Sequence, residues 1–155
     1  MKIALVAHDA RKQELIEWVK FNRQELSKHT LYATGTTGKL IATVELPTDE
    51  TTADGATHLE VIRLLSGPLG GDQQIGAMIA EGKIDCLIFF CDNLITQGHQ
   101  QDVGALSRLA SLYNIAFATN RTTADMILTS PLWKDANYQP ILPECINNYK
   151  NRKLQ

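Results

Sequence analysis

The chain has 155 residues, enough for one compact domain, and its 44% hydrophobic and 21% charged residues are the composition of an ordinary globular protein. Its net charge of −2 provides no overall attraction for nucleic acid or for an anionic membrane, so we expect neither as a partner. The cysteines, Cys86, Cys91 and Cys145, are odd in number and lack CxxC spacing, which argues against a disulfide framework or a zinc site and favours a reducing cytoplasm.

The first stretch of the chain is a short apolar run that ends at His8 and Asp9. It lacks the long apolar core and the small-residue cleavage site of a signal peptide. No stretch of the sequence reaches the roughly 20 apolar residues that are needed to span a bilayer. We therefore expect a cytoplasmic protein.

Short apolar runs alternate with stretches of helical periodicity along the whole chain, as buried strands and amphipathic helices do. In chain order the sequence predicts a strand over residues 3–7, a helix over 11–27, a strand over 30–34, a helix over 35–42, a strand over 59–65, a helix that begins near Asp72, a strand over 85–92, a helix over 103–113, a strand over 115–119 and a helix over 122–130. Residues 139–143 predict a last extended piece before a polar, basic end.

Residues 45–58 differ from the rest of the chain. They contain Pro47, Gly55 and four acidic residues, but no lysine or arginine. Proline and glycine interrupt regular structure, and this composition is typical of an exposed loop. We interpret the chain as a single domain, residues 1–155, that carries this acidic loop.

The alternation of strands and helices predicts an α/β fold: a three-layer sandwich with a mostly parallel central sheet flanked by helices on both faces. In such folds, ligands bind beyond the carboxyl ends of the strands. Most of the chain's chemically versatile polar residues directly follow a predicted strand. They lie at 8–9, 34–38, 66–72, 92–102 and 119–120. This clustering predicts a polar site at one edge of the sheet.

Two features could hold a phosphate group. The sequence TGTTG, residues 34–38, combines hydroxyl groups with glycines at the start of a predicted helix, where backbone N–H groups are free to bind an anion. Lys12 stands near the start of the first helix and could turn inward as a point charge. The alternatives are an ordinary turn capped by a threonine, and a lysine that points into solvent.

His8 and His99 follow strands and could polarise a carbonyl or move protons near neutral pH. Asp72, Asp92 and Asp102 are expected at the same edge. Asp72 follows a glycine-rich turn, so it is either a helix N-cap or a base beside a bound anion. A helix N-terminus stabilises the ionised carboxylate and weakens it as a base, so a catalytic Asp72 would need a site that stabilises the developing oxyanion.

Asp92 could instead hold a histidine or the loop backbone in place. A metal site made from Cys91, Asp92 and His99 is a less favoured alternative, because the residues lack a recognisable ligand spacing.

Several long motifs resemble the methylglyoxal synthase family. They are LVAHDARK (5–12), LYATGTTG (31–38), LSGPLGGDQQIGAMIAEGKIDCLIFF (65–90), HQQDV (99–103) and IAFATNRTTAD (115–125). The resemblance implies a lyase that converts dihydroxyacetone phosphate to methylglyoxal and inorganic phosphate without a metal or an organic cofactor. It also implies a homo-oligomer, usually a hexamer.

The resemblance also implies roles for individual residues. Asp72 matches the catalytic base, and Asp102 matches a further acid of the site, which we take as a proton-transfer partner of His99. The substrate-binding positions match His8, Lys12, Thr34, Gly35, Thr36, Thr37, Ser66, Gly67 and His99. Asp9 and Asp92 match further acids of the family's site, and Arg152 is similar to a basic residue that can approach the phosphate site of a neighbouring subunit.

The sequence departs from the family pattern at two places. Gln100 and Gln101 stand where the family often has Asp-Pro, and the acidic loop lengthens the segment between TGTTG and SGP. Since the charge of the loop would repel a dianionic substrate, we expect the loop to point away from the site. The rival function is a regulatory domain of the same fold, which would bind a phosphate ligand but would not need Asp72, His99 and Asp102 together.

Overall fold

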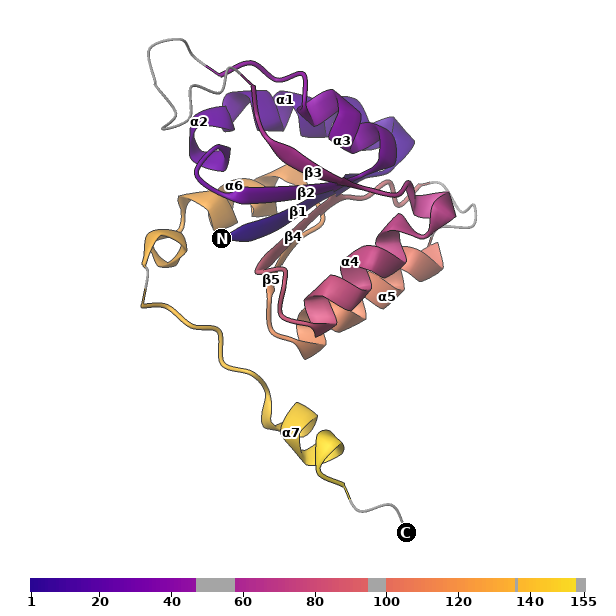
Figure 1. Cartoon of the computed structure of the whole chain (residues 1–155), viewed down its shortest axis with the longest axis vertical. Coiled ribbons are helices and arrows are strands. Elements are labelled where there is room, and N and C mark those ends of the chain that lie inside the picture. The colour runs from indigo at the N-terminus through magenta and orange to yellow at the C-terminus, as the bar shows by residue number, and fades with distance from the viewer. Residues whose placement is uncertain (47–57, 95–99, 136, 153–155) are drawn as a thin grey trace.

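The computed structural model describes residues 1–46, 58–94, 100–135 and 137–152 of the chain. Its centre is a five-stranded sheet with the strand order β3-β2-β1-β4-β5, and every strand pairs with its neighbours in parallel (Figure 1). The strands are β1 (Lys2–Ala7), β2 (Thr30–Thr34), β3 (Val61–Leu64), β4 (Cys86–Phe90) and β5 (Ala116–Ala118). The predicted parallel sheet is therefore confirmed.

Helices cover both faces of the sheet, which gives the predicted three layers (Figure 1). One face carries α1 (Lys12–Phe21), α2 (Arg23–Leu26), α3 (Gly35–Ile41) and α6 (Arg121–Thr129), and the other carries α4 (Gly71–Ala80) and α5 (Gln100–Leu112). Short 3-10 turns complete the domain at η1 (Asp9–Arg11), η2 (Gly67–Leu69) and η3 (Pro131–Lys134). No helix in these described segments is long and apolar enough to cross a membrane.

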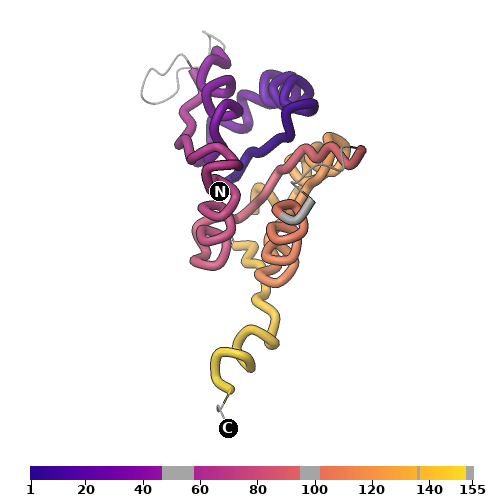
Figure 2. Tube along the Cα trace, turned by 90° about the vertical axis from the view of Figure 1, so that its right-hand side faces the viewer, coloured from indigo at the N-terminus to yellow at the C-terminus, as the bar shows by residue number. Residues whose placement is uncertain are grey.

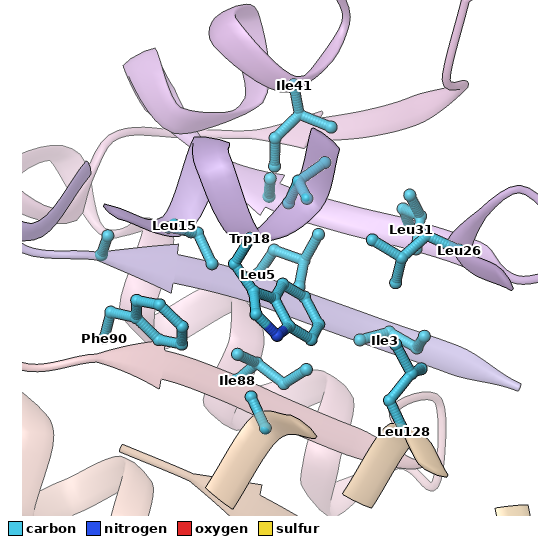
Figure 3. Close-up of a cluster of buried hydrophobic side chains, with 14 of the residues drawn as sticks. Ile3, Leu5, Leu15, Trp18, Leu26, Leu31, Ile41, Ile88, Phe90 and Leu128 are labelled. Carbon is cyan, nitrogen blue, oxygen red and sulfur yellow. The ribbon is translucent and has the colours of Figure 1, made fainter. Parts of the chain in front are cut away.

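Alternation along β1 divides the core into two clusters. Ile3 and Leu5 pack under α1, α3 and α6, whereas Ala4 and Val6 pack under α4 and α5. Such two-sided burial explains why the strand is nearly all apolar. Figure 3 shows the first cluster, where the Trp18 ring lies between α1 and the sheet. The indole Nε1–H of Trp18 donates to Asp125 Oδ1 on α6 at 2.7 Å, which joins α1 to α6.

The predicted helix over residues 11–27 is two helices, with a break at Asn22. The Asn22 backbone leaves the helical region (φ −99°, ψ 13°), and its side-chain Nδ2 donates to Trp18 O at 3.0 Å. An asparagine side chain competes for backbone hydrogen bonds in this way and ends helices. The prediction of one continuous helix was wrong for this reason.

The acidic loop lies mostly outside the described residues, which resume at His58. The two ends of the predicted segment, Glu45 and His58, form an isolated antiparallel bridge. The expectation that the loop points away from the site remains an expectation.

Residues 137–152, which we call the C-terminal arm, run away from the rest of the domain (Figure 2). The arm ends in α7 (Glu144–Lys150), a helix that the sequence analysis did not predict. Ile141 and Tyr149 of the arm are exposed, and the Arg152 guanidinium lies 3.6 Å from the centre of the Tyr149 ring.

Candidate active site

The carboxyl ends of the parallel strands meet at one edge of the sheet, which we call the carboxyl edge. Hydrogen bonds between neighbouring turns hold this edge together. Gly35 N donates to Leu65 O at 3.2 Å, and Cys91 N donates to Thr119 O at 3.1 Å. The turns that follow β2, β3, β4 and β5 are thus fixed in pairs, as the sequence pattern predicts for a site built from strand ends.

The turn after β2 carries threonine hydroxyl groups that are not used to cap α3. Thr34 occupies the N-cap position of α3, but within the described residues its side chain makes no capping bond, so the plain threonine cap does not account for this turn. Thr37 is fully buried and Thr36 is exposed. Gly35 adopts φ +40°, and a Cβ at this position would lie 2.7 Å from Ser66 Cβ. A glycine is therefore required where this turn meets the one after β3.

Lys12 turns toward the start of α3. Its ammonium group donates to Thr36 Oγ1 at 2.6 Å and also pairs with the Asp9 carboxylate. The alternative of a lysine extended into solvent is wrong, since its side chain is only 24% exposed. The ammonium group of Lys12 thus lies beside the Thr36 hydroxyl, and a cation with hydroxyl groups is the set of donors that a phosphate needs.

The glycines after β3 meet a backbone requirement. A Cβ on Gly71 would lie 2.0 Å from Leu65 O, and Gly70 adopts φ +97°. Ser66 O accepts bonds from Leu69 N and Gly71 N, both at 3.0 Å, which folds the chain tightly before α4. Only glycine permits this close approach of strand and helix.

This tight turn places Asp72 in an unusual position. Asp72 is the second residue of α4 and only 9% exposed, and Gly70 takes the N-cap position, so Asp72 is not the N-cap that one interpretation of the sequence suggested. Its Oδ2 accepts a bond from Gln73 Nε2 at 2.7 Å. Its Oδ1 is buried and accepts no bond from any residue that the structure describes. A buried carboxylate oxygen without a partner is costly and calls for a functional explanation.

His8 connects the ends of β1 and β4. Its Nδ1 accepts a bond from Asp92 N at 2.8 Å, and its ring packs edge-on against Phe89 with 5.0 Å between the centres. A neutral His8 therefore carries its proton on Nε2. Asp92 Oδ1 in turn accepts a bond from Leu94 N at 3.0 Å, so Asp92 holds both the histidine and its own loop in place.

Cys91 is a core residue even though it follows β4. Its thiol donates to Phe89 O at 3.2 Å, and burial raises its pKa to about 11. The thiol stays protonated at neutral pH.

The remaining predicted residues are placed less completely. His99 lies outside the described residues, and Asp102 lies half-buried in the first turn of α5. Ser66 and Gly67 form the turn before α4, and among the described atoms none lies within 4 Å of a Cβ built on Gly67. Arg152 follows α7 by two residues, and α7 lies on the C-terminal arm, away from the carboxyl edge of its own chain (Figure 1).

Sequence reasoning did not single out Gln73, which contacts the Asp72 carboxylate. The only sequence signal was its place beside Asp72 in the GGDQQ motif.

Comparison with known proteins agrees with this geometry. The family model described as "MGS-like domain" matches residues 14–119. A methylglyoxal synthase of Leptospira interrogans is 55% identical over 130 residues, which cover 84% of this chain and 80% of the relative. A methylglyoxal synthase of Maridesulfovibrio salexigens is 53% identical over 153 residues, which cover 98% and 96% of the two chains.

A solved structure shows the same likeness. The crystal structure of a methylglyoxal synthase from Elizabethkingia anophelis superimposes with a TM-score of 0.81 at 44% identity, and the match covers 99% of this chain and 92% of the other. The sheet, the motifs at its carboxyl edge and these relatives lead to one conclusion: the chain belongs to the methylglyoxal synthase family.

Proposed function

We propose that the protein is a methylglyoxal synthase, a lyase that converts dihydroxyacetone phosphate to methylglyoxal and inorganic phosphate. The observation that carries this proposal is Asp72, a buried carboxylate with one oxygen left without a partner among the described residues. Relatives of this chain at 51–56% identity are named methylglyoxal synthase, which supports the proposal. A carboxylate held in this way is suited to accept a proton from a bound molecule.

The reaction needs only proton transfer and elimination. The Asp72 carboxylate takes a proton from the hydroxymethyl carbon beside the carbonyl, and the C–H electron pair forms a carbon–carbon double bond while the carbonyl oxygen becomes an enediolate oxygen. A proton then passes from the hydroxyl group on that carbon to the former carbonyl oxygen, which leaves the charge on the first oxygen. This oxygen forms the aldehyde C=O bond, the carbon–carbon double bond shifts toward the carbon that bears the phosphate, and the C–O bond breaks to release inorganic phosphate. The remaining enol takes up a proton and ketonises to methylglyoxal.

The geometry supports a division of labour along the carboxyl edge. Lys12 and residues 34–37 hold the phosphate, because they combine a cation with hydroxyl groups. Ser66 and Gly67 contact the substrate beside Asp72. His8 donates from Nε2 to the carbonyl oxygen, since its Nδ1 is occupied by Asp92 N. Such a donor stabilises the charge that develops on the oxygen as the proton leaves.

His99 and Asp102 form the proton-transfer pair in this proposal, and Asp9 orients Lys12 through their ion pair. We propose no metal and no organic cofactor, because the chemistry above does not need one. A reducing cytoplasm is the proposed location.

The C-terminal arm supports the proposal of a homo-oligomer, a hexamer. The arm carries Arg152 away from the carboxyl edge of its own chain, so a contact between Arg152 and phosphate would be made in a neighbouring subunit (Figure 1). Light scattering of the purified protein tests the assembly. If Arg152 serves a neighbour's site, Arg152→Met raises KM while the assembly stays intact.

The rival proposal is a regulatory domain that only binds a phosphate ligand. Such a domain has no use for a buried, unpaired carboxylate oxygen next to the ligand, because an anion beside another anion weakens binding. The test is to incubate the purified protein with dihydroxyacetone phosphate and to measure phosphate and methylglyoxal in parallel. Equal amounts of both products support the enzyme; tight binding of inorganic phosphate with no turnover supports the regulatory domain.

A further inference from the structure

The two oxygens of the Asp72 carboxylate have different surroundings. Oδ2 accepts a hydrogen bond from Gln73 Nε2 at 2.7 Å. Oδ1 is buried, but it has no hydrogen-bond partner among the described residues. The carboxylate is therefore held by one oxygen and leaves the other one available for chemistry.

The contact between Asp72 and Gln73 is not one that a helix provides by itself. Side chains at adjacent helix positions point in different directions and do not normally face each other. Gln73 reaches Asp72 by folding back over the start of α4, where its Oε1 lies 3.4 Å from the place that a Cβ on Gly70 would occupy. A Cβ on Gly70 would be in ordinary van der Waals contact with this oxygen, so it is the φ of +97° and not the carboxamide that requires a glycine there.

We propose that Gln73 is a positioning residue that fixes the rotation of the Asp72 carboxylate and so directs Oδ1 at the proton to be removed. This inference rests on the proposed function, in which Asp72 is the base. The torsion that turns a carboxylate plane is broad, so without a fixed partner the plane rotates over a wide range. A hydrogen bond to Oδ2 selects one orientation before the substrate arrives.

The neighbouring Gln74 has a separate task, which shows that the two glutamines are not interchangeable. Its Oε1 accepts a bond from Leu65 N at 2.9 Å, and this bond secures the strand end rather than the carboxylate. The chain also offers a matched pair that does not involve Asp72. On the outer side of α1, exposed Gln13 donates from Nε2 to Glu17 Oε1 at 3.0 Å, the same kind of bond as that between Gln73 and Asp72.

The experiment compares Gln73→Met, Gln73→Glu and the control Gln13→Met with the wild type. Methionine keeps the length of the side chain and suits a helix but removes the donor. Glutamate also removes the amide donor but keeps the shape of the side chain, and a negative charge is favourable in the first turn of a helix. The measurements are kcat, KM, the melting temperature, and the isotope effect on kcat with substrate deuterated at the hydroxymethyl carbon.

For Gln73→Met we expect kcat to fall about 10- to 100-fold, the loss typical of a misplaced catalytic group, with KM within about 3-fold of the wild type. The isotope effect should stay at or above the wild-type value, because the slowed step is proton abstraction. Gln73→Glu should lose at least as much kcat, and Gln13→Met should behave as the wild type. The positioning role is overturned if Gln73→Met keeps wild-type kcat, if only KM changes, or if the isotope effect disappears.

The outcomes also separate the two proposals. A wild-type protein that does not turn over dihydroxyacetone phosphate overturns both the proposed function and this inference. Full turnover by the wild type and by both Gln73 variants leaves the proposed function standing and removes Gln73 alone.

Discussion

The two edges of the sheet use the same residue types for different purposes. At the carboxyl edge, Asp72 has a buried oxygen with no partner among the described residues. At the opposite edge, where the strands begin, Asp85 Oδ2 accepts a bond from Lys2 N at 2.7 Å and thereby fastens β4 to β1. Both carboxylates lie near strand ends, but Asp85 accepts its bond from the backbone, whereas Asp72 accepts one from a side chain.

The histidines show the same contrast. His29 at the amino edge accepts a bond from Trp133 Nε1 at 3.0 Å, and its other nitrogen lies 3.3 Å from the N-terminal ammonium. This histidine fastens η3 to the body of the domain and lines an open hollow of about 610 Å³ together with Met1 and Ala116. This hollow therefore lies at the amino edge and not at the proposed site. The proposed site is instead marked by a buried carboxylate oxygen without a partner among the described residues.

The largest expected effect comes from exchanging the two carboxylates for amides. Asp72→Asn should lower kcat by roughly 10³-fold or more, since general-base catalysis is worth up to about 10⁴-fold, while the variant still binds substrate analogues. Asp85→Asn should keep kcat and lower the melting temperature, because it weakens the bond to Lys2 N. The measurements are steady-state turnover and thermal unfolding. Full activity of Asp72→Asn would remove Asp72 as the base.

A smaller effect is expected from Lys12→Met. Loss of the ammonium group beside Thr36 should raise KM and weaken the binding of inorganic phosphate about 10-fold or more, the value of a charge-assisted hydrogen bond. Lys20→Met in the last turn of α1 is the control, because Lys20 is exposed. Phosphate inhibition constants give the comparison, and equal constants for the two variants would contradict a phosphate role for Lys12.

At the amino edge we expect an effect of pH on stability. Burial lowers the pKa of His29 below its ordinary value of 6.5, and the N-terminal ammonium lowers it further, against the opposing influence of Glu25. Just below pH 6.5 the unfolded chain therefore binds a proton more readily than the folded chain, so stability is lost as the pH falls from about 6.5 through the lowered pKa.

Denaturant midpoints of the wild type and of His29→Gln, measured between pH 7.5 and pH 5, isolate this contribution. The wild type should lose more stability than the variant over this range. Equal losses would show that the bond between His29 and Trp133 has no part in the pH dependence.

The smallest effect concerns the thiols, which look alike in sequence. Burial raises the pKa of Cys86 to about 12 and that of Cys91 to about 11, whereas Cys145 on the C-terminal arm is exposed. A disulfide reagent should therefore label Cys145 quickly in the native protein and the other two only after unfolding. Rapid labelling of Cys91 would show that the carboxyl edge is more open at β4 than its packing indicates.

The sequence predicted the parts of the fold that depend on periodicity. The all-apolar runs at β1 and β4 identified strands buried on both faces, and their parallel order then gathered His8 and Asp92 at one edge. The sequence also left two alternatives for Lys12, a side chain turned inward and one extended into solvent, and the structure has the first.

Other features depend on three-dimensional contacts that periodicity does not encode. The break at Asn22 is caused by a side-chain bond to Trp18 O. The contact between Gln73 and Asp72 joins adjacent helix positions, which do not normally face each other, and α7 forms at the end of an arm whose preceding residues show no helical pattern. In each case a particular contact in the folded protein outweighs the secondary-structure propensity of the segment.

The strand order has a consequence for biosynthesis. β1 is made first but lies in the middle of the sheet, between β2 and β4. During translation β2 can pair with β1 soon after it leaves the ribosome, whereas the other side of β1 waits until Cys86–Phe90 has been made. The nascent chain therefore exposes an apolar strand edge for most of its synthesis, and such edges are prone to wrong pairing. Completion of β4 covers this edge of β1, and the open edge then moves to β4 until Ala116–Ala118 of β5 has been made.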